Sequence, residues 1–155
     1  MKLVIVLLAV VISASTASAQ SVPLGKDETL WQNGDMLSDL KTPIDWNGFE
    51  LVIVQTKQPD GKVGGVLRAI KDGKATDVAT WQLSNATAAF AAVHVRKGKA
   101  AFEFGRAMNL DARDNGTDAY LELVVKKGKV TTGKKWSGDR ASTRPAWVKA
   151  IDPAM

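Results

Sequence analysis

Lysines beside turn glycines are the residues of this 155-residue chain whose types and spacing are best suited to chemistry. Four short segments share the pattern: Pro59-Asp60-Gly61-Lys62, Lys71-Asp72-Gly73-Lys74, Arg96-Lys97-Gly98-Lys99 and Lys126-Lys127-Gly128-Lys129. Ammonium and guanidinium groups donate charge-assisted hydrogen bonds to carboxylates and phosphates, and such bonds are about twice as strong as neutral ones. The pattern therefore favours an anionic ligand. The competing interpretation is that these lysines keep hairpin ends soluble and discourage edge pairing.

The charge balance of the whole chain points the same way. The formal net charge is +5, and the positive excess lies towards the C-terminus. A cationic field attracts anionic partners, of which acidic glycans, phosphorylated lipids and nucleic acid are the general classes. We expect a glycan or another anionic surface ligand and no nucleic acid. The alternative is that the charge serves only solubility.

Residues for catalysis are scarce. His94 is the only histidine, the chain has no cysteine, and no Gly-x-Ser-x-Gly sequence occurs. The chain therefore has no thiol nucleophile and no nucleophile motif for a serine triad. Asp111, Asp114 and Asp118 lie in one polar loop without the spacing of a calcium-binding EF-hand. We expect a protein that is not an enzyme, with no catalytic residue, no metal site and no cofactor.

The first nineteen residues have the pattern of an export signal. A basic Met1-Lys2 precedes an apolar run from Leu3 to Ile12, and Ala17-Ser18-Ala19 matches an A-x-A cleavage site. The run is shorter than the ~20 residues that span a bilayer. We expect a signal peptide over 1–19, a single domain over 20–155 with a C-terminal tail from about 140, and a secreted or periplasmic location. The lack of cysteine favours a bacterial origin over a disulfide-bearing eukaryotic one.

Alternation of apolar and polar residues dominates the rest of the chain, and period 2 is the mark of a half-buried strand. The expected strands are Phe49–Gln55, Val63–Ile70, Thr76–Leu83, Phe90–Val95, Ala100–Phe104 and Leu121–Val125. Gly64-Gly65 within one strand indicates a bulge or a close backbone approach. The class is therefore all-β, with roughly eight to twelve short strands in a sandwich, barrel or prism.

Two further features concern organisation. Gly61, Gly98 and Gly128 recur at spacings within the ~20–50 residues that mark repeats, so we expect a unit copied about three times. Near the C-terminus, Pro145 excludes a central strand position. The segment Thr143–Val148 is therefore expected as an edge strand, as a tail on the body, or as an arm that docks on a second copy.

Several segments together resemble the bulb-type lectins, the monocot mannose-binding or β-prism II family. They cover most of the chain between Glu28 and Asp139, with a Leu-x-x-Gly-like opening, an Asn-Gly before a strand, glycine turns and tryptophan phrases. The matching segments are Leu30–Leu37, Asn47–Ile53, Asp60–Lys62, Trp81–Thr87, Asn115–Leu123 and Lys135–Ser137. The resemblance implies a β-prism II-like arrangement of three short antiparallel sheets. It also implies a homodimer that exchanges C-terminal strands.

The family binds mannose through Gln-x-Asp-x-Asn-x-Val-x-Tyr, and this chain departs from that motif. In the first unit, the resemblance places Gln58, Asp60 and Lys62 at the polar positions, with Gly64 and Val66 for Val and Tyr. The second unit offers His94, Arg96 and Lys99, or Val95 and Lys97 in another alignment. The third offers Lys126 or Lys127, with Lys129, after Val124 or Val125.

Lysine carries only donors, so it cannot replace the carboxylate that accepts a sugar hydroxyl. A mismatch of this kind costs ~1–3 kcal/mol. We therefore expect an exported lectin-like carbohydrate-binding module that does not bind mannose in the ordinary way and favours acidic glycans. The alternative is a structural or interaction protein on a lectin-like scaffold without sugar binding.

Overall fold

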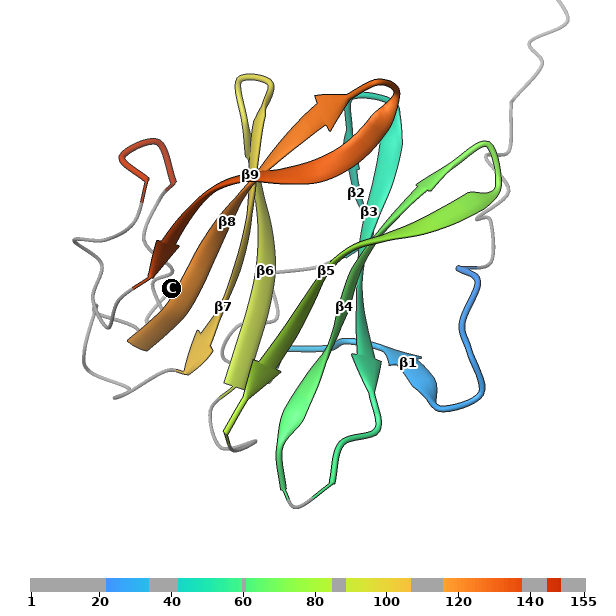
Figure 1. Cartoon of the computed structure of the whole chain (residues 1–155), viewed down its shortest axis with the longest axis vertical. Coiled ribbons are helices and arrows are strands. Elements are labelled where there is room, and N and C mark those ends of the chain that lie inside the picture. The colour runs from blue at the N-terminus through green and yellow to red at the C-terminus, as the bar shows by residue number, and fades with distance from the viewer. Residues whose placement is uncertain are drawn as a thin grey trace, which may run out of the picture.

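The computed structural model describes residues 22–33, 42–59, 61–84, 89–106, 116–137 and 145–148. The predicted signal peptide over 1–19, Asp60 and the acidic residues Asp111 and Asp114 lie outside this part of the chain. The described residues form nine strands and no helix, all paired antiparallel (Figure 1). The all-β class predicted from the alternation is confirmed. Within the same residues, no helix has the length and hydropathy to cross a membrane.

The first sheet is built around a long central hairpin. Its strands are β1 (Glu28–Leu30), β2 (Ile44–Trp46), β3 (Phe49–Thr56), β4 (Val63–Lys71) and β5 (Lys74–Leu83). The order is β1-β3-β4-β5, and β2 also pairs with β3. The two short strands share one edge of β3, since β1 pairs with its end and β2 with its beginning.

The second sheet is a simple meander. Its strands β6 (Ala89–Arg96), β7 (Lys99–Arg106), β8 (Gly116–Lys126) and β9 (Lys129–Ser137) are neighbours in sequence order. The polar loop expected to extend to Asp118 therefore gives way to a strand at Gly116. β8 begins earlier than Leu121 because the ladder with β7 continues to Arg106.

One apolar core lies between the sheets. The alternating residues of both sheets enter it, with Leu51 and Ile53 from β3, Phe102 from β7 and Leu123 from β8. Neither sheet closes into a barrel within the described residues. Two sheets on a shared core correspond to the sandwich alternative rather than to three sheets, so the β-prism arrangement is not confirmed.

Tight two-residue turns close the four hairpins at one end of the molecule (Figure 1). The central residues are Asn47-Gly48, Asp72-Gly73, Lys97-Gly98 and Lys127-Gly128, and all have positive φ, from 48° to 75°. Positive φ at both positions defines the type I′ turn that matches strand twist, and glycine adopts it without strain. Gly61 lies in the β3–β4 connection at the opposite end. The three glycines taken as marks of one repeat are therefore not equivalent, and the repeating element is the hairpin.

Gly64 and Gly65 in β4 permit neighbouring backbone to approach closely. Of the two expected alternatives, a bulge and a close backbone approach, the structure shows the second. A Cβ added to Gly65 would lie 1.8 Å from the Val54 carbonyl oxygen, and one added to Gly64 would lie 2.5 Å from the Trp81 carbonyl oxygen. The register shift between β4 and β5 falls later, at Leu67/Arg68.

The C-terminal segment lies on the body of the same chain. Residues 145–148 form a turn, in which the Val148 amide donates to the Pro145 carbonyl at 2.8 Å. Val148 is buried against Ala101 and Tyr120 on the outer face of the second sheet. Of the three expected alternatives, an edge strand, a tail on the body and an arm on a second copy, this placement corresponds to the tail. Exchange of this segment with a second copy finds no support in the structure.

Candidate functional site

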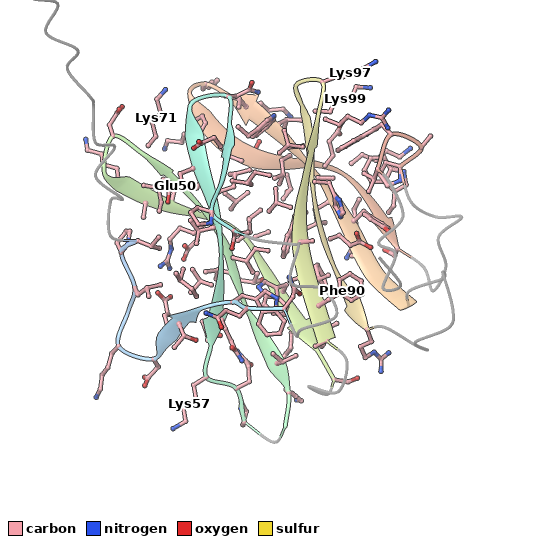
Figure 2. All side chains as sticks on the ribbon, turned by 180° about the vertical axis from the view of Figure 1, so that it is seen from behind. Glu50, Lys57, Lys71, Phe90, Lys97 and Lys99 are labelled. Carbon is pink, nitrogen blue, oxygen red and sulfur yellow. The ribbon has the colours of Figure 1, made fainter. Side chains whose placement is uncertain are left out.

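Basic side chains lie at the β4–β5, β6–β7 and β8–β9 turns, at the end of the molecule where the β2–β3 turn also lies (Figure 1). Figure 2 shows Lys71, Lys97 and Lys99 at this end of the molecule and Lys57 at the other. We call this group of exposed residues the cationic end: Lys71, Lys74, Arg96, Lys97, Lys99, Lys126, Lys127 and Lys129. Asp72 is the one acidic residue in the turns and their flanking positions, 46–49, 71–74, 96–99 and 126–129.

A cavity of about 240 Å³ opens between the β4–β5 and β8–β9 hairpins. Phe49 contributes an apolar wall, and Lys71, Lys74 and Lys129 surround it together with Thr76. The Lys71 ammonium lies 5.1 Å from the centre of the Phe49 ring. Attraction between a cation and an aromatic face, worth about 0.5–1 kcal/mol at exposed sites, favours this position of the ammonium at the cavity.

The cationic end has no ion-pair partner in the part of the chain that the structure describes. Among the described residues, the ion pairs are Arg68 with Glu28, Arg68 with Asp77 and His94 with Glu103, and none includes a residue of the cationic end. Each lysine ammonium therefore has three N–H groups that can donate hydrogen bonds to the oxygen atoms of a ligand. Since these charges are exposed, their attraction for a ligand is screened beyond ~8 Å at physiological ionic strength.

The turns that carry these charges are held by backbone geometry and by one contact between the sheets. The Trp46 indole Nε1 donates a hydrogen bond to the Gly98 carbonyl at 2.9 Å. This bond joins the β2–β3 hairpin of the first sheet to the β6–β7 turn of the second. The position of the charged β6–β7 turn relative to the first sheet is therefore set partly by a buried tryptophan.

The structure brings together some of the residues expected at the site and separates others. Arg96 and Lys99 flank the β6–β7 turn, and Lys126 and Lys129 flank the β8–β9 turn, all at the cationic end. Lys71 and Lys74 belong with them, although the resemblance did not assign them to a ligand site. The turn motif Lys71-Asp72-Gly73-Lys74 was the available signal, whereas the contact with Phe49 depends on folding.

Gln58 and Lys62 lie in the β3–β4 connection, away from the cationic end. The Gln58 amide is engaged within the protein, because its Nε2 donates to Thr56 Oγ1 at 2.7 Å and its Oε1 accepts from Gln82 at 3.0 Å. These partners sit beside a second hollow, next to Trp81. The residues Gln58, His94 and Lys129 therefore do not belong to one site.

His94 lies on the outer face of the second sheet and pairs with a buried carboxylate. Its Nε2 is 2.6 Å from Oε2 of Glu103, a residue that is only 1% exposed. Burial of a carboxylate is costly without hydrogen-bonding partners. This contact gives His94 a structural role in the second sheet.

No family model, curated protein or solved structure matches this chain. The resemblance to the bulb-type lectins therefore stays a prediction from the sequence. Within the described ranges, no group of three or more His, Asp or Glu side chains is placed to hold a metal ion.

Proposed function

We propose that the protein is an exported, lectin-like binding module that recognises an acidic glycan at its cationic end. The observation that carries the proposal is the cavity beside Phe49, where Lys71, Lys74 and Lys129 converge without an ion-pair partner among the described residues. Its volume is below the ~300–1,000 Å³ of drug-sized sites. One charged sugar unit suits such a cavity, with the rest of the glycan on the surrounding surface.

The chemistry of the cavity favours acidic over neutral sugars. A uronate carboxylate or a sulfate accepts hydrogen bonds from ammonium donors, and the charge strengthens each bond. Asp72 and Thr76 supply acceptor capacity for hydroxyl groups at the same wall. A neutral mannose would use the hydroxyl acceptors but gain little from the three ammonium groups.

The scaffold in this proposal is that of a bulb-type lectin, although the described residues form two sheets where the β-prism II family has three. It is supported by the sequence resemblance and, more coarsely, by the antiparallel all-β architecture. The homodimer implied by the resemblance is not part of the proposal, because Pro145–Val148 lies on its own chain.

Binding of a uronic-acid oligosaccharide and of its neutral counterpart to the chain over 20–155 tests the proposal. Isothermal titration at low salt should detect the acidic ligand and not the neutral one. Lys71→Ala plus Lys74→Ala should weaken binding at least tenfold, since each charge-assisted bond contributes ~1 kcal/mol or more. The matched control is Lys57→Ala plus Lys62→Ala, which removes two lysines from the opposite end. Equal binding of both sugars, or equal loss in the two double variants, would overturn the proposal.

A second candidate is a structural or interaction protein that has kept the scaffold without a sugar site. The engaged amide of Gln58 favours it, since one Nε2 donor and one Oε1 acceptor position at the first-unit site of the lectin motif are already used within the protein. Absence of binding on a glycan array that includes acidic and neutral sugars would support this candidate.

A further inference from the structure

Two hairpins of the second sheet end in the same sequence pattern. The β6–β7 tip reads Val95-Arg96-Lys97-Gly98-Lys99, and the β8–β9 tip reads Val125-Lys126-Lys127-Gly128-Lys129. Val95 and Val125 occupy equivalent positions and are 36% and 40% exposed. They are two of the exposed large apolar residues of the described chain, and both lie beside a cationic turn.

The register explains why these valines are exposed. Val95 and Val125 pair with Ala100 and Val130, and they continue the face that carries buried Val93 and Leu123. The core face of the second sheet therefore extends past the core and reaches solvent at the tips. Ala100 of β7 pairs with both Val95 and Leu123, so Val125 lies two residues beyond the position opposite Val95. Two strand spacings across the sheet and two residues along it separate the two valines by roughly 12 Å.

The tips combine apolar side chains with cations and carry no acidic residue between 95 and 99 or between 125 and 129. Single exposed apolar residues are common on protein surfaces. Val95 and Val125, by contrast, lie at equivalent positions, and each is next to basic residues. Proteins that bind at a bilayer interface place apolar groups in the headgroup region and cations on anionic lipids, and the two tips match that pattern.

We propose that the β6–β7 and β8–β9 tips dock on the surface of an anionic lipid bilayer. Arg96, Lys97, Lys126 and Lys127 contact lipid phosphates, while Val95 and Val125 enter the headgroup layer. The protein binds peripherally and does not span the bilayer. Charge complementarity selects this partner, and the valines distinguish it from nucleic acid, whose phosphate backbone offers no apolar layer beneath the charges.

The β8–β9 tip belongs to both proposals, since Gly128 and Lys129 line the glycan cavity. The substituted residues differ: the glycan test changes Lys71 and Lys74, whereas the lipid test changes Val95, Lys97, Val125 and Lys127, none of which lines that cavity. The two sets of variants therefore distinguish the two proposals.

Co-sedimentation of the chain over 20–155 with large vesicles tests the inference. The vesicles contain phosphatidylcholine alone or an equal mixture with phosphatidylglycerol. We expect binding to the mixed vesicles only. Lys97→Asn plus Lys127→Asn should weaken it about thirtyfold, since each basic residue near an anionic surface is worth ~1 kcal/mol. Asparagine is the chosen replacement because both lysines have positive φ, 48° and 49°, which asparagine tolerates.

Val95→Ser plus Val125→Ser should weaken binding about fivefold and abolish the part that resists high salt, since the apolar contact is lost. The matched control is Leu24→Ser plus Leu30→Ser, because these residues are 42% and 38% exposed but lie in the N-terminal segment and β1. Melting temperatures show that each variant is folded.

Three results would overturn the inference. The first is equal binding to vesicles with and without phosphatidylglycerol. The second is an unchanged affinity after the valine substitutions, which would leave only a general cationic attraction. The third is tighter binding of a double-stranded DNA oligonucleotide than of the mixed vesicles at the same ionic strength.

Discussion

The Arg68 guanidinium forms a bidentate pair with the Glu28 carboxylate, in which Nη1 donates to Oε2 at 2.8 Å and Nη2 donates to Oε1 at 2.9 Å. The same guanidinium donates to Asp77 Oδ1 at 2.7 Å and to the Pro23 carbonyl at 2.6 Å. Arg68 lies in β4 and is 8% exposed, while Pro23 and Glu28 belong to the N-terminal segment. The guanidinium thus fastens that segment to the outer face of the first sheet.

Replacement of Arg68 by methionine should destabilise the fold by about 2 kcal/mol, because the change leaves the largely buried Glu28 carboxylate without its cation, while the half-exposed Asp77 adds little. Arg68→Lys should recover only part of the loss, since an ammonium cannot form the paired bonds. Urea denaturation measures both. A methionine variant as stable as the parent chain would show that the N-terminal segment is not held by this contact.

The hydrogen bonds from Arg68, together with one from the Gly25 amide, lower the pKa of the Glu28 carboxyl below its ordinary range. As the pH falls, the Glu28 carboxylate is protonated in the unfolded chain before it is protonated in the folded protein. The contact therefore stabilises the fold fully at pH values above the ordinary glutamate pKa of ~4.3. This stabilisation is lost as the pH falls through the lower pKa of the folded protein. Glu28→Gln should remove this part of the acid sensitivity. Thermal melting from neutral to acidic pH measures it, with Glu50→Gln as control, and parallel melting curves for all three proteins would contradict the assignment.

Much of the fold follows from local patterns, whereas pairing between distant segments does not. The alternation around Leu51 and Ile53 predicts β3 because the strand has one face on the core. β1 has little burial of its own and forms only against β3, so its residues carry no clear signal. Arg68 interrupts the apolar run Val66–Ile70, and its partners Pro23 and Glu28 are too distant in sequence for a local pattern to indicate them.

The candidate site was likewise predictable only where it depends on local sequence. Turn chemistry locates lysines next to Gly98 and Gly128, since such turns need positive φ. Which turns share one end of the molecule depends on how the hairpins are connected. Phe49 therefore enters the cavity as a partner that no short motif contains.

Gly65→Ala should be among the most damaging small substitutions in the chain. The added Cβ would lie 1.8 Å from the Val54 carbonyl oxygen, and the nearest atoms all belong to the backbone of β3, which does not shift easily. Overpacking of this kind costs ~3 kcal/mol or more. Gly133→Ala is the control, because its Cβ would meet the end of the flexible Glu122 side chain. Equal stability of the two variants in urea would refute the close approach.

Export should remove the first nineteen residues and leave Gln20 as the new N-terminus, because Ala17-Ser18-Ala19 follows the apolar run. Expression of the full sequence in a bacterium with a general secretion pathway, followed by intact-mass measurement of the periplasmic fraction, tests this. Substitution of Ala19 by a bulky residue should block the cleavage. A secreted product that retains Met1 to Ala19 would contradict the signal-peptide prediction.

The C-terminal segment should stabilise the monomer rather than join two copies. Val148 is buried on Ala101 and Tyr120, and the Trp147 carbonyl accepts a hydrogen bond from Arg96 at 3.3 Å. Val148→Asp should therefore lower the Tm by about 6 °C, from a loss of about 2 kcal/mol, whereas Ala146→Asp at an exposed position should have little effect. Truncation before Arg144 should lower the Tm likewise and leave the molar mass in light scattering at that of one chain. A parent protein that scatters as a dimer and a truncated one that scatters as a monomer would instead show that the segment is an exchanged arm.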